Sequence, residues 1–191
     1  MEERGYLFLL IGVGMLAAPT LLGAPNDVAG FGWIPLFMGI RSMRTSGREL
    51  QNALYFAIFG LVISWSLWFG IEFVPELFFQ FQLVSLFIVL RVFFDAGTFF
   101  WLLKAEYMWA PNQQKRLEWL GFSAVGATYF LVSAIITFST TSMFDLPINI
   151  LFSLFRISRP IAIVYHGVLV FIFVKLYLEA KGNSGGLRRW N

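Results

Sequence analysis

Long apolar stretches alternate with short polar stretches along almost the whole chain. Because lipid offers the backbone no hydrogen bonds, an apolar run of about 20 residues, with a tolerance of roughly 17 to 25, predicts a helix that crosses a membrane. Four runs fit this length well. They cover residues 6–23, 53–70, 83–103 and 119–138.

A fifth run, residues 28–40, is apolar but short. It follows the turn-forming sequence Ala-Pro-Asn-Asp at residues 24–27, which predicts a tight reversal. We therefore expect residues 28–40 to return across the membrane as the second arm of a hairpin. Whether this arm spans fully is left open.

The last run, residues 146–178, is interrupted by Arg156, Arg159 and Pro160. One helix of that length would overshoot a bilayer at about 1.5 Å per residue. We expect residues 147–155 to lie at the interface or to re-enter the membrane. Pro160 then begins the spanning helix, because proline is tolerated in a first helical turn.

These runs predict an all-α fold. It is a polytopic transmembrane helical bundle of about six membrane-spanning helices, arranged as three hairpins. The loops leave no room for a domain outside the membrane, so residues 1–181 form a single domain. The polar end, residues 182–191, is expected to be a flexible cytoplasmic tail.

The basic residues predict the orientation, because Lys and Arg collect in cytoplasmic loops. Six alternating helices bring eleven of the 14 Lys and Arg to one face, which places both termini in the cytoplasm. The opposite face then carries Asp27, Glu72, Glu76 and Asp145. The eleven residues are Arg4, Arg41, Arg44, Arg48, Lys104, Lys115, Arg116, Lys175, Lys181, Arg188 and Arg189.

The first run could also belong to a signal peptide. However, Glu2 and Glu3 interrupt the basic start that such a peptide needs, and the apolar run continues to Gly23. We expect it to be retained as a membrane helix. The short loops favour a cytoplasmic-type membrane, most simply the bacterial inner membrane.

Composition agrees with a lipid environment and excludes several chemistries. Hydrophobic residues make up 58% of the chain and charged residues 13%, about half of what soluble domains carry. With no Cys and one His, neither a thiolate nor a His-based metal site is expected, and no cofactor is predicted. The formal charge of +3 is too small to indicate nucleic acid.

The most informative polar residues are Arg91 and Asp95. They lie four positions apart, so they share one helix face, and they fall in the middle third of their run. Charges at that depth are costly and usually face the bundle interior. The pair predicts a site that binds a substrate group or relays a proton. A self-neutralising pair that fixes helix packing is the equally weighted alternative.

Three further candidates lie in the last run. Arg156 and Arg159 fall on the acidic face, where they could bind an anionic headgroup or substrate. Pairing with Glu72, Glu76 or Asp145 is the simpler interpretation. His166 is a secondary candidate for binding or proton transfer, although a lone His in a bundle is more often a packing residue.

The remaining patterns have simpler explanations. Glu72 and Glu76 could form a cation-attracting outer mouth, but a solvated loop is favoured. Trp residues near helix ends predict interfacial anchors. Gly14 and Ala18, four apart, predict a close helix contact. The six Trp residues in question are Trp33, Trp65, Trp68, Trp101, Trp109 and Trp119.

No catalytic motif for phosphate binding, serine hydrolysis or zinc proteolysis occurs, and no catalytic residue is assigned. We expect a small-molecule transport component, either a compact permease or a membrane-embedded substrate-binding subunit. The alternative is a non-catalytic accessory subunit of a membrane complex. Partners would bind through helix faces or through the cytoplasmic loops at residues 41–48 and 104–116. An intramembrane lipid enzyme is the least favoured class.

Overall fold

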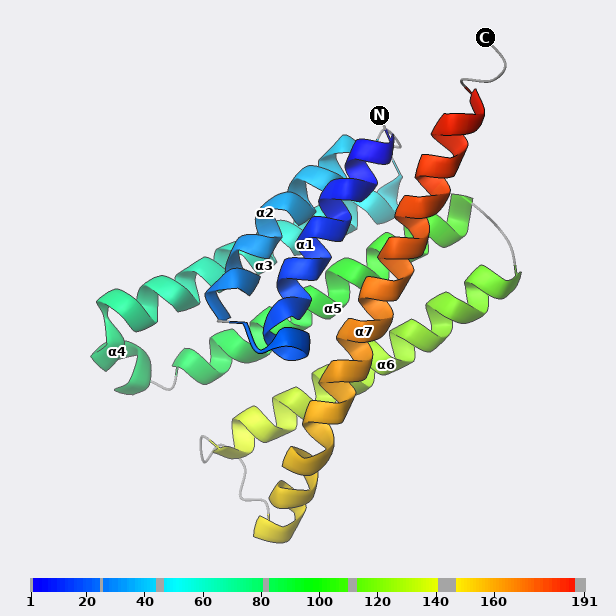
Figure 1. The fold of residues 1–191 in the computed structure, drawn as a ribbon. Helices are drawn as coiled ribbons and strands as arrows, with labels where there is room; N and C mark the ends of the chain where they lie inside the picture. The colour runs from blue at the N-terminus through cyan, green and yellow to red at the C-terminus, as the bar shows by residue number, and fades with distance from the viewer. Residues whose placement is uncertain are drawn as a thin grey trace.

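The described parts of the chain fold into helices and contain no strand, as the sequence predicted. The computed structural model describes residues 2–24, 26–43, 47–80, 83–109, 113–140 and 147–187. In these ranges there are seven helices and no strand (Figure 1). The helices are α1 (Glu2–Leu22), α2 (Asn26–Ser42), α3 (Arg48–Phe73), α4 (Pro75–Gln80), α5 (Leu83–Trp109), α6 (Gln113–Thr140) and α7 (Ile148–Leu187).

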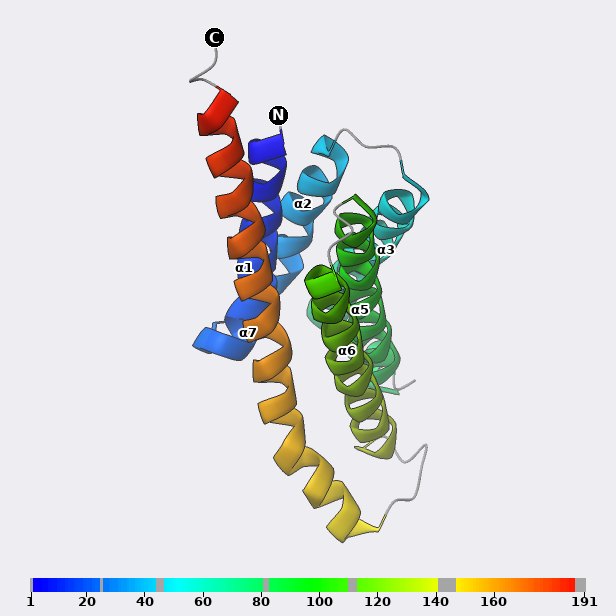
Figure 2. The same cartoon turned by 90° about the vertical axis from the view of Figure 1, so that its right-hand side faces the viewer.

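The six longer helices form two layers, which Figure 2 shows edge-on. Helices α7, α1 and α2 make one layer, and α6, α5 and α3 make the other. Contacts between α2 and α3 join the layers at one edge, and contacts between α6 and α7 join them at the other. The helices therefore form a closed ring around the space between the layers.

Five helical segments are long and apolar enough to cross a membrane. The chain is therefore a candidate multi-pass membrane protein. Helix α2 has 17 residues, about 26 Å at 1.5 Å per residue, and lies at the lower limit for spanning. The five segments are Glu3–Leu22, Arg48–Phe73, Leu83–Ala105, Trp119–Thr137 and Phe152–Gly182.

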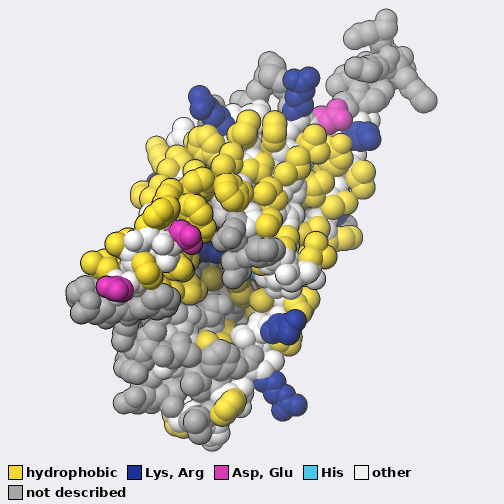
Figure 3. All heavy atoms as spheres, turned by 60° about the vertical axis from the view of Figure 1, so that its left-hand side comes forward, with side chains coloured by type: hydrophobic (Ala, Val, Ile, Leu, Met, Phe, Trp, Pro, Cys, Tyr) yellow, Lys and Arg dark blue, Asp and Glu magenta, His cyan; other side chains and the backbone are white. Residues whose placement is uncertain are grey.

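Apolar side chains also cover much of the outer surface. Large hydrophobic side chains are exposed on every long helix, and Phe152 and Phe171 on α7 are each 69% exposed. Figure 3 shows one face, where hydrophobic side chains form a broad surface and Lys and Arg lie near the chain termini and also at the opposite end of the molecule. Such a surface suits contact with acyl chains rather than water.

The start of α1 and the end of α7 lie at the same end of the bundle, here called the termini end (Figure 1). Near it, buried apolar side chains fill the space between the layers. Phe99 on α5 packs edge-to-face on Phe173 of α7 with ring centroids 5.8 Å apart. Leu9, Ile40 and Leu102 belong to the same core. This half of the interior is closed by packing.

Helices α1 and α2 approach each other through glycines. A Cβ atom on Gly32 would lie 2.9 Å from the carbonyl oxygen of Gly12 and 3.0 Å from the amide nitrogen of Leu16. The predicted contact at Gly14 is wrong, because Gly14 is exposed and a Cβ there would meet nothing within 4 Å. The packed glycines Gly12 and Gly32 have no small residue four positions away, so this spacing did not identify the packed face.

Helix α7 differs from the prediction at both ends. It runs unbroken through Pro160, so residues 148–155 are not a separate segment and Pro160 does not begin a helix. Proline costs one backbone hydrogen bond and bends a helix, but the turns on either side can continue; Figure 2 shows α7 curving along its length. Residues 182–187, expected in the flexible tail, are helical. Residues 188–191 lie outside the described ranges.

Candidate functional site

A cavity of about 550 Å³ lies between the two layers, in the half of the interior away from the termini end. All six long helices contribute to its wall. Thr20, Ile71 and Glu72, near the ends of α1 and α3, lie at its rim, and Asp95 and His166 lie deeper in the bundle. The lining residues are Leu16, Pro19, Thr20, Gly30, Phe31, Trp33, Trp65, Leu67, Trp68, Ile71, Glu72, Ile88, Arg91, Val92, Asp95, Tyr129 and His166.

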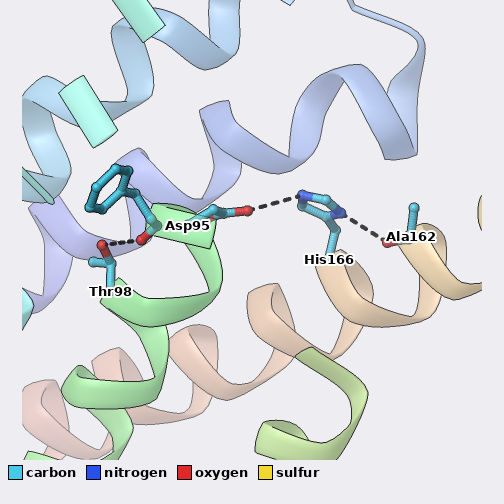
Figure 4. A network of polar contacts seen from close by, with 5 residues as sticks. Asp95, Thr98, Ala162 and His166 are labelled. Atoms are coloured by element: carbon cyan, nitrogen blue, oxygen red, sulfur yellow. Dashed lines mark hydrogen bonds and ion pairs between the residues drawn. The ribbon is translucent and has the colours of Figure 1, made fainter. Parts of the chain in front are cut away.

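The deepest polar groups are a carboxylate and an imidazole from opposite layers. Asp95 on α5 and His166 on α7 point toward each other, with 4.0 Å between Asp95 Oδ2 and His166 Nε2 (Figure 4). Asp95 is 7% exposed and His166 is 4% exposed. Asp95 lies 12 residues into α5, roughly 18 Å from its start, and so near the middle of the helix.

The hydrogen bond at Nδ1 of His166 determines whether the other ring nitrogen, Nε2, is a donor or an acceptor. Nδ1 lies 2.9 Å from the carbonyl oxygen of Ala162. A carbonyl only accepts, so Nδ1 carries a hydrogen and donates it. In a neutral ring, Nε2 is then an acceptor, and it faces Asp95. Two acceptors therefore face each other at 4.0 Å, too far apart for a direct hydrogen bond.

Asp95 has no hydrogen-bond donor among the described residues. Its Oδ1 atom is buried without a hydrogen-bond partner. The Thr98 hydroxyl, one turn away, donates to the backbone oxygen of Phe94 at 2.7 Å and therefore does not donate to Asp95. A buried carboxylate without a hydrogen-bond donor costs free energy unless it is protonated or a ligand donates a hydrogen bond to it.

Arg91 lies one turn before Asp95 and is half-buried in the cavity wall. Within the described ranges, no hydrogen bond or ion pair joins Arg91 to Asp95 or to another side chain. The two charges share a helix face, as their spacing predicted. They are not arranged as a contact pair, and the guanidinium group has no hydrogen-bonded carboxylate among the described residues.

Aromatic side chains form most of the remaining wall. Trp65 packs edge-to-face on Phe31 with centroids 5.4 Å apart. Tyr129 stacks on Tyr165 at 4.8 Å and meets the edge of His166 at 5.6 Å, which holds the imidazole in place. The indole N–H groups of Trp33 and Trp65 are buried without acceptors in the described structure.

Trp33 corrects the prediction of interfacial anchoring, because it is 0% exposed and lies inside the bundle. Trp65 and Trp68 also line the cavity. The sequence pattern did not predict that these tryptophans line a cavity, since an aromatic residue near a helix end can face either lipid or a cavity. Tyr129 was likewise not singled out. The side chain of Trp109 lies outside the described residues.

The cavity brings together only some of the predicted site residues. Arg91, Asp95, His166 and Glu72 line it. Glu76 is exposed on α4, outside the lining. Arg156 and Arg159 are exposed on α7 and also lie outside the lining.

The predicted pairing of these two arginines is not found within the described ranges. No ion pair joins Arg156 or Arg159 to Glu72 or Glu76 in the described parts of the chain. The third proposed partner, Asp145, lies outside them, as does the side chain of Asp27. Within the same ranges, no group of three or more His, Cys, Asp or Glu side chains is placed to hold a metal ion.

Comparisons of the chain with models of protein families, with curated proteins and with solved structures give no match. The chemistry of the cavity is therefore the basis for assigning a function.

Proposed function

We propose that this protein is a small-molecule transport component, either a compact permease or the membrane-embedded substrate-binding subunit of a larger transporter. One observation carries the proposal. A cavity of about 550 Å³ enters the bundle from one end and reaches a buried, incompletely bonded carboxylate near the middle of α5. This volume falls within the range of roughly 300 to 1,000 Å³ that is usual for small-molecule sites.

The proposed topology has six passes, with α2 as the sixth membrane-spanning helix. Helix α2 packs along α1 and returns to the termini end (Figure 1). With α2 as a span, Arg4, Arg41, Arg48, Lys104 and Lys181 all lie toward that end, as cytoplasmic residues should. The termini are then cytoplasmic, and the cavity opens to the outer face. We assign the protein to the bacterial cytoplasmic membrane.

The interior is asymmetric in a way that suits transport. The half near the termini is closed by the core around Phe99 and Phe173, and the other half is hollow. A substrate would enter from the outer face and stop at Asp95. Release to the cytoplasm would require the Phe99–Phe173 contact to separate, as alternating access demands.

An accessory subunit gives a weaker account of the same features. A subunit that only packs and seals needs no hollow, and it gains nothing from an unpaired carboxylate inside it. Buried ionisable groups in membrane helices are costly and mark substrate or proton paths. In the proposed site, Arg91 binds an anionic group. Asp95 and His166 face each other at the deepest polar point of the cavity, and this pair is the proton-exchanging element.

Replacing Asp95 with Asn tests this function. Purified protein in mild detergent, and the same protein in vesicles, would be incubated with a defined mixture of amino acids, nucleosides, carboxylic acids and vitamins. Mass spectrometry then measures what is retained or accumulated. We expect the wild type to take up at least one compound. Asp95→Asn should lower uptake by roughly tenfold or more, since a hydrogen bond to a charged group contributes about 1.5–3 kcal/mol.

Glu76→Gln is the matched control, because Glu76 is an exposed carboxylate outside the cavity. It should leave uptake unchanged. A wild-type protein that neither retains nor accumulates any compound would contradict a transport role and favour the accessory subunit. Unchanged uptake by Asp95→Asn would remove the site assignment.

A further inference from the structure

We infer that the cavity binds a zwitterion of the amino-acid class, with an ammonium and a carboxylate group close together and an apolar or aromatic side group. This inference rests on the proposed function and names its substrate class. It follows from the positions of three polar side chains and from the wall around them.

The Asp95–His166 gap has the form of an ammonium site. Both facing atoms are acceptors when the imidazole is neutral, and they lie 4.0 Å apart with no donor between them. Two N–H bonds of about 2.8 Å that diverge at a tetrahedral angle reach acceptors roughly 4.6 Å apart, close to this separation. One ammonium group can therefore donate to Asp95 and His166 together.

Arg91 supplies the complementary half. It lies one turn from Asp95 on the same face of α5, and its guanidinium group has no carboxylate partner in the described structure. One helical turn rises about 5.4 Å. An α-amino acid separates its nitrogen and carboxylate carbon by about 2.5 Å, so the long Arg91 side chain can reach the carboxylate while the ammonium stays at Asp95.

Charge balance favours a ligand with both signs. A simple anion would pair Arg91 but leave Asp95 without a donor, and a simple cation would do the reverse. Leaving the buried Asp95 carboxylate without a donor is strongly unfavourable, and leaving the half-buried Arg91 without an acceptor is unfavourable to a lesser degree. A zwitterion completes both groups at once.

The rest of the wall accounts for the side group. Phe31, Trp65 and Trp68 present aromatic surface between the rim and the polar groups. This surface suits an apolar or aromatic side group, which stacks on such rings. Glu72 at the rim disfavours anionic ligands and attracts the ammonium group.

Three matched probes test the inference on the purified wild-type protein in mild detergent. L-Phenylalanine carries both groups, phenethylamine lacks the carboxylate, and 3-phenylpropionate lacks the ammonium. Binding is measured by calorimetric titration, with L-leucine and L-tryptophan as zwitterions of other sizes. We expect at least one of the three amino acids to bind. Each truncated probe should bind the wild type roughly tenfold or more weakly than L-phenylalanine.

The variants assign each half of the ligand. Arg91→Gln should weaken binding of L-phenylalanine more than binding of phenethylamine, and Asp95→Asn should weaken it more than binding of 3-phenylpropionate. Glu76→Gln should change neither. If a variant fails to fold, the comparison of probes on the wild type still decides the question.

Two kinds of result would overturn the inference. Equal binding of 3-phenylpropionate or phenethylamine and L-phenylalanine would show that one charge suffices. Failure of all three amino acids to bind would exclude the class. If the metabolite mixture still yields a retained compound, the transport function survives and only the substrate class is wrong.

Discussion

Trp33 reaches the interior because α3 has no side chain at the point where the indole lies. A Cβ atom on Gly60 would fall 2.4 Å from Cη2 of Trp33 and within 2.7 Å of two other ring atoms. Gly60 is therefore needed for space rather than for an unusual backbone conformation. Through this contact, a glycine outside the lining sets the position of a tryptophan that belongs to it.

Gly60→Ala should displace Trp33 and lower the free energy of unfolding by about 1–3 kcal/mol, the usual cost of overpacking. Thermal unfolding in detergent measures the stability, and the tryptophan emission spectrum reports the displacement. Gly14→Ala is the control, since it meets nothing within 4 Å and removes a flexible helical glycine. An unchanged spectrum and stability for Gly60→Ala would show that the indole does not occupy this position.

At this scale, sequence spacing predicted part of the site. Arg91 and Asp95 share a face because positions four apart on one helix are neighbours. The approach of His166 to Asp95 could not be predicted, since it depends on how α5 and α7 are placed across the bundle. The position of Tyr129, which packs against His166 from α6, could not be predicted for the same reason.

The positions of most helices could be predicted, because each depends on the length of one apolar run in the sequence. The predicted runs correspond closely to α1, α2, α3, α5 and α6. Helix α4 was missed, since six residues after Pro75 give too short a pattern to separate from a loop. The error in α7 came from treating Pro160 as a boundary, whereas the helix continues through it.

The α1–α2 contact depends on backbone atoms that cannot move aside. Gly32→Ala should therefore push these helices apart and destabilise the protein by about 1–3 kcal/mol. Gly30→Ala, on the same helix, is a matched control because its Cβ would meet nothing within 4 Å. Thermal unfolding of both variants distinguishes them. Equal stability would mean that α1 and α2 do not approach through Gly32.

The whole molecule combines two layers that are packed together at one end and separated by a cavity at the other. This arrangement depends on how well side chains from different helices fill the space between them, which the sequence of a single helix does not show. Sequence could therefore indicate a membrane bundle and two charges on one helix face, but not the cavity that both of them line. We therefore expect ligands to reach Asp95 from the face opposite the termini.

Cysteine labelling tests this claim most directly, because the chain contains no cysteine of its own. Single substitutions would be exposed to a membrane-impermeant maleimide in right-side-out vesicles. Glu76→Cys marks the proposed outer face and Lys181→Cys the cytoplasmic face. Val92→Cys reports on the cavity wall, and Leu102→Cys reports on the closed core.

We expect Glu76→Cys and Val92→Cys to be labelled from outside, and Leu102→Cys and Lys181→Cys to be protected until the membrane is opened with detergent. If Val92→Cys is protected from outside, or reacts only when the reagent has access to the face of Lys181→Cys, the outward-facing cavity does not exist as described.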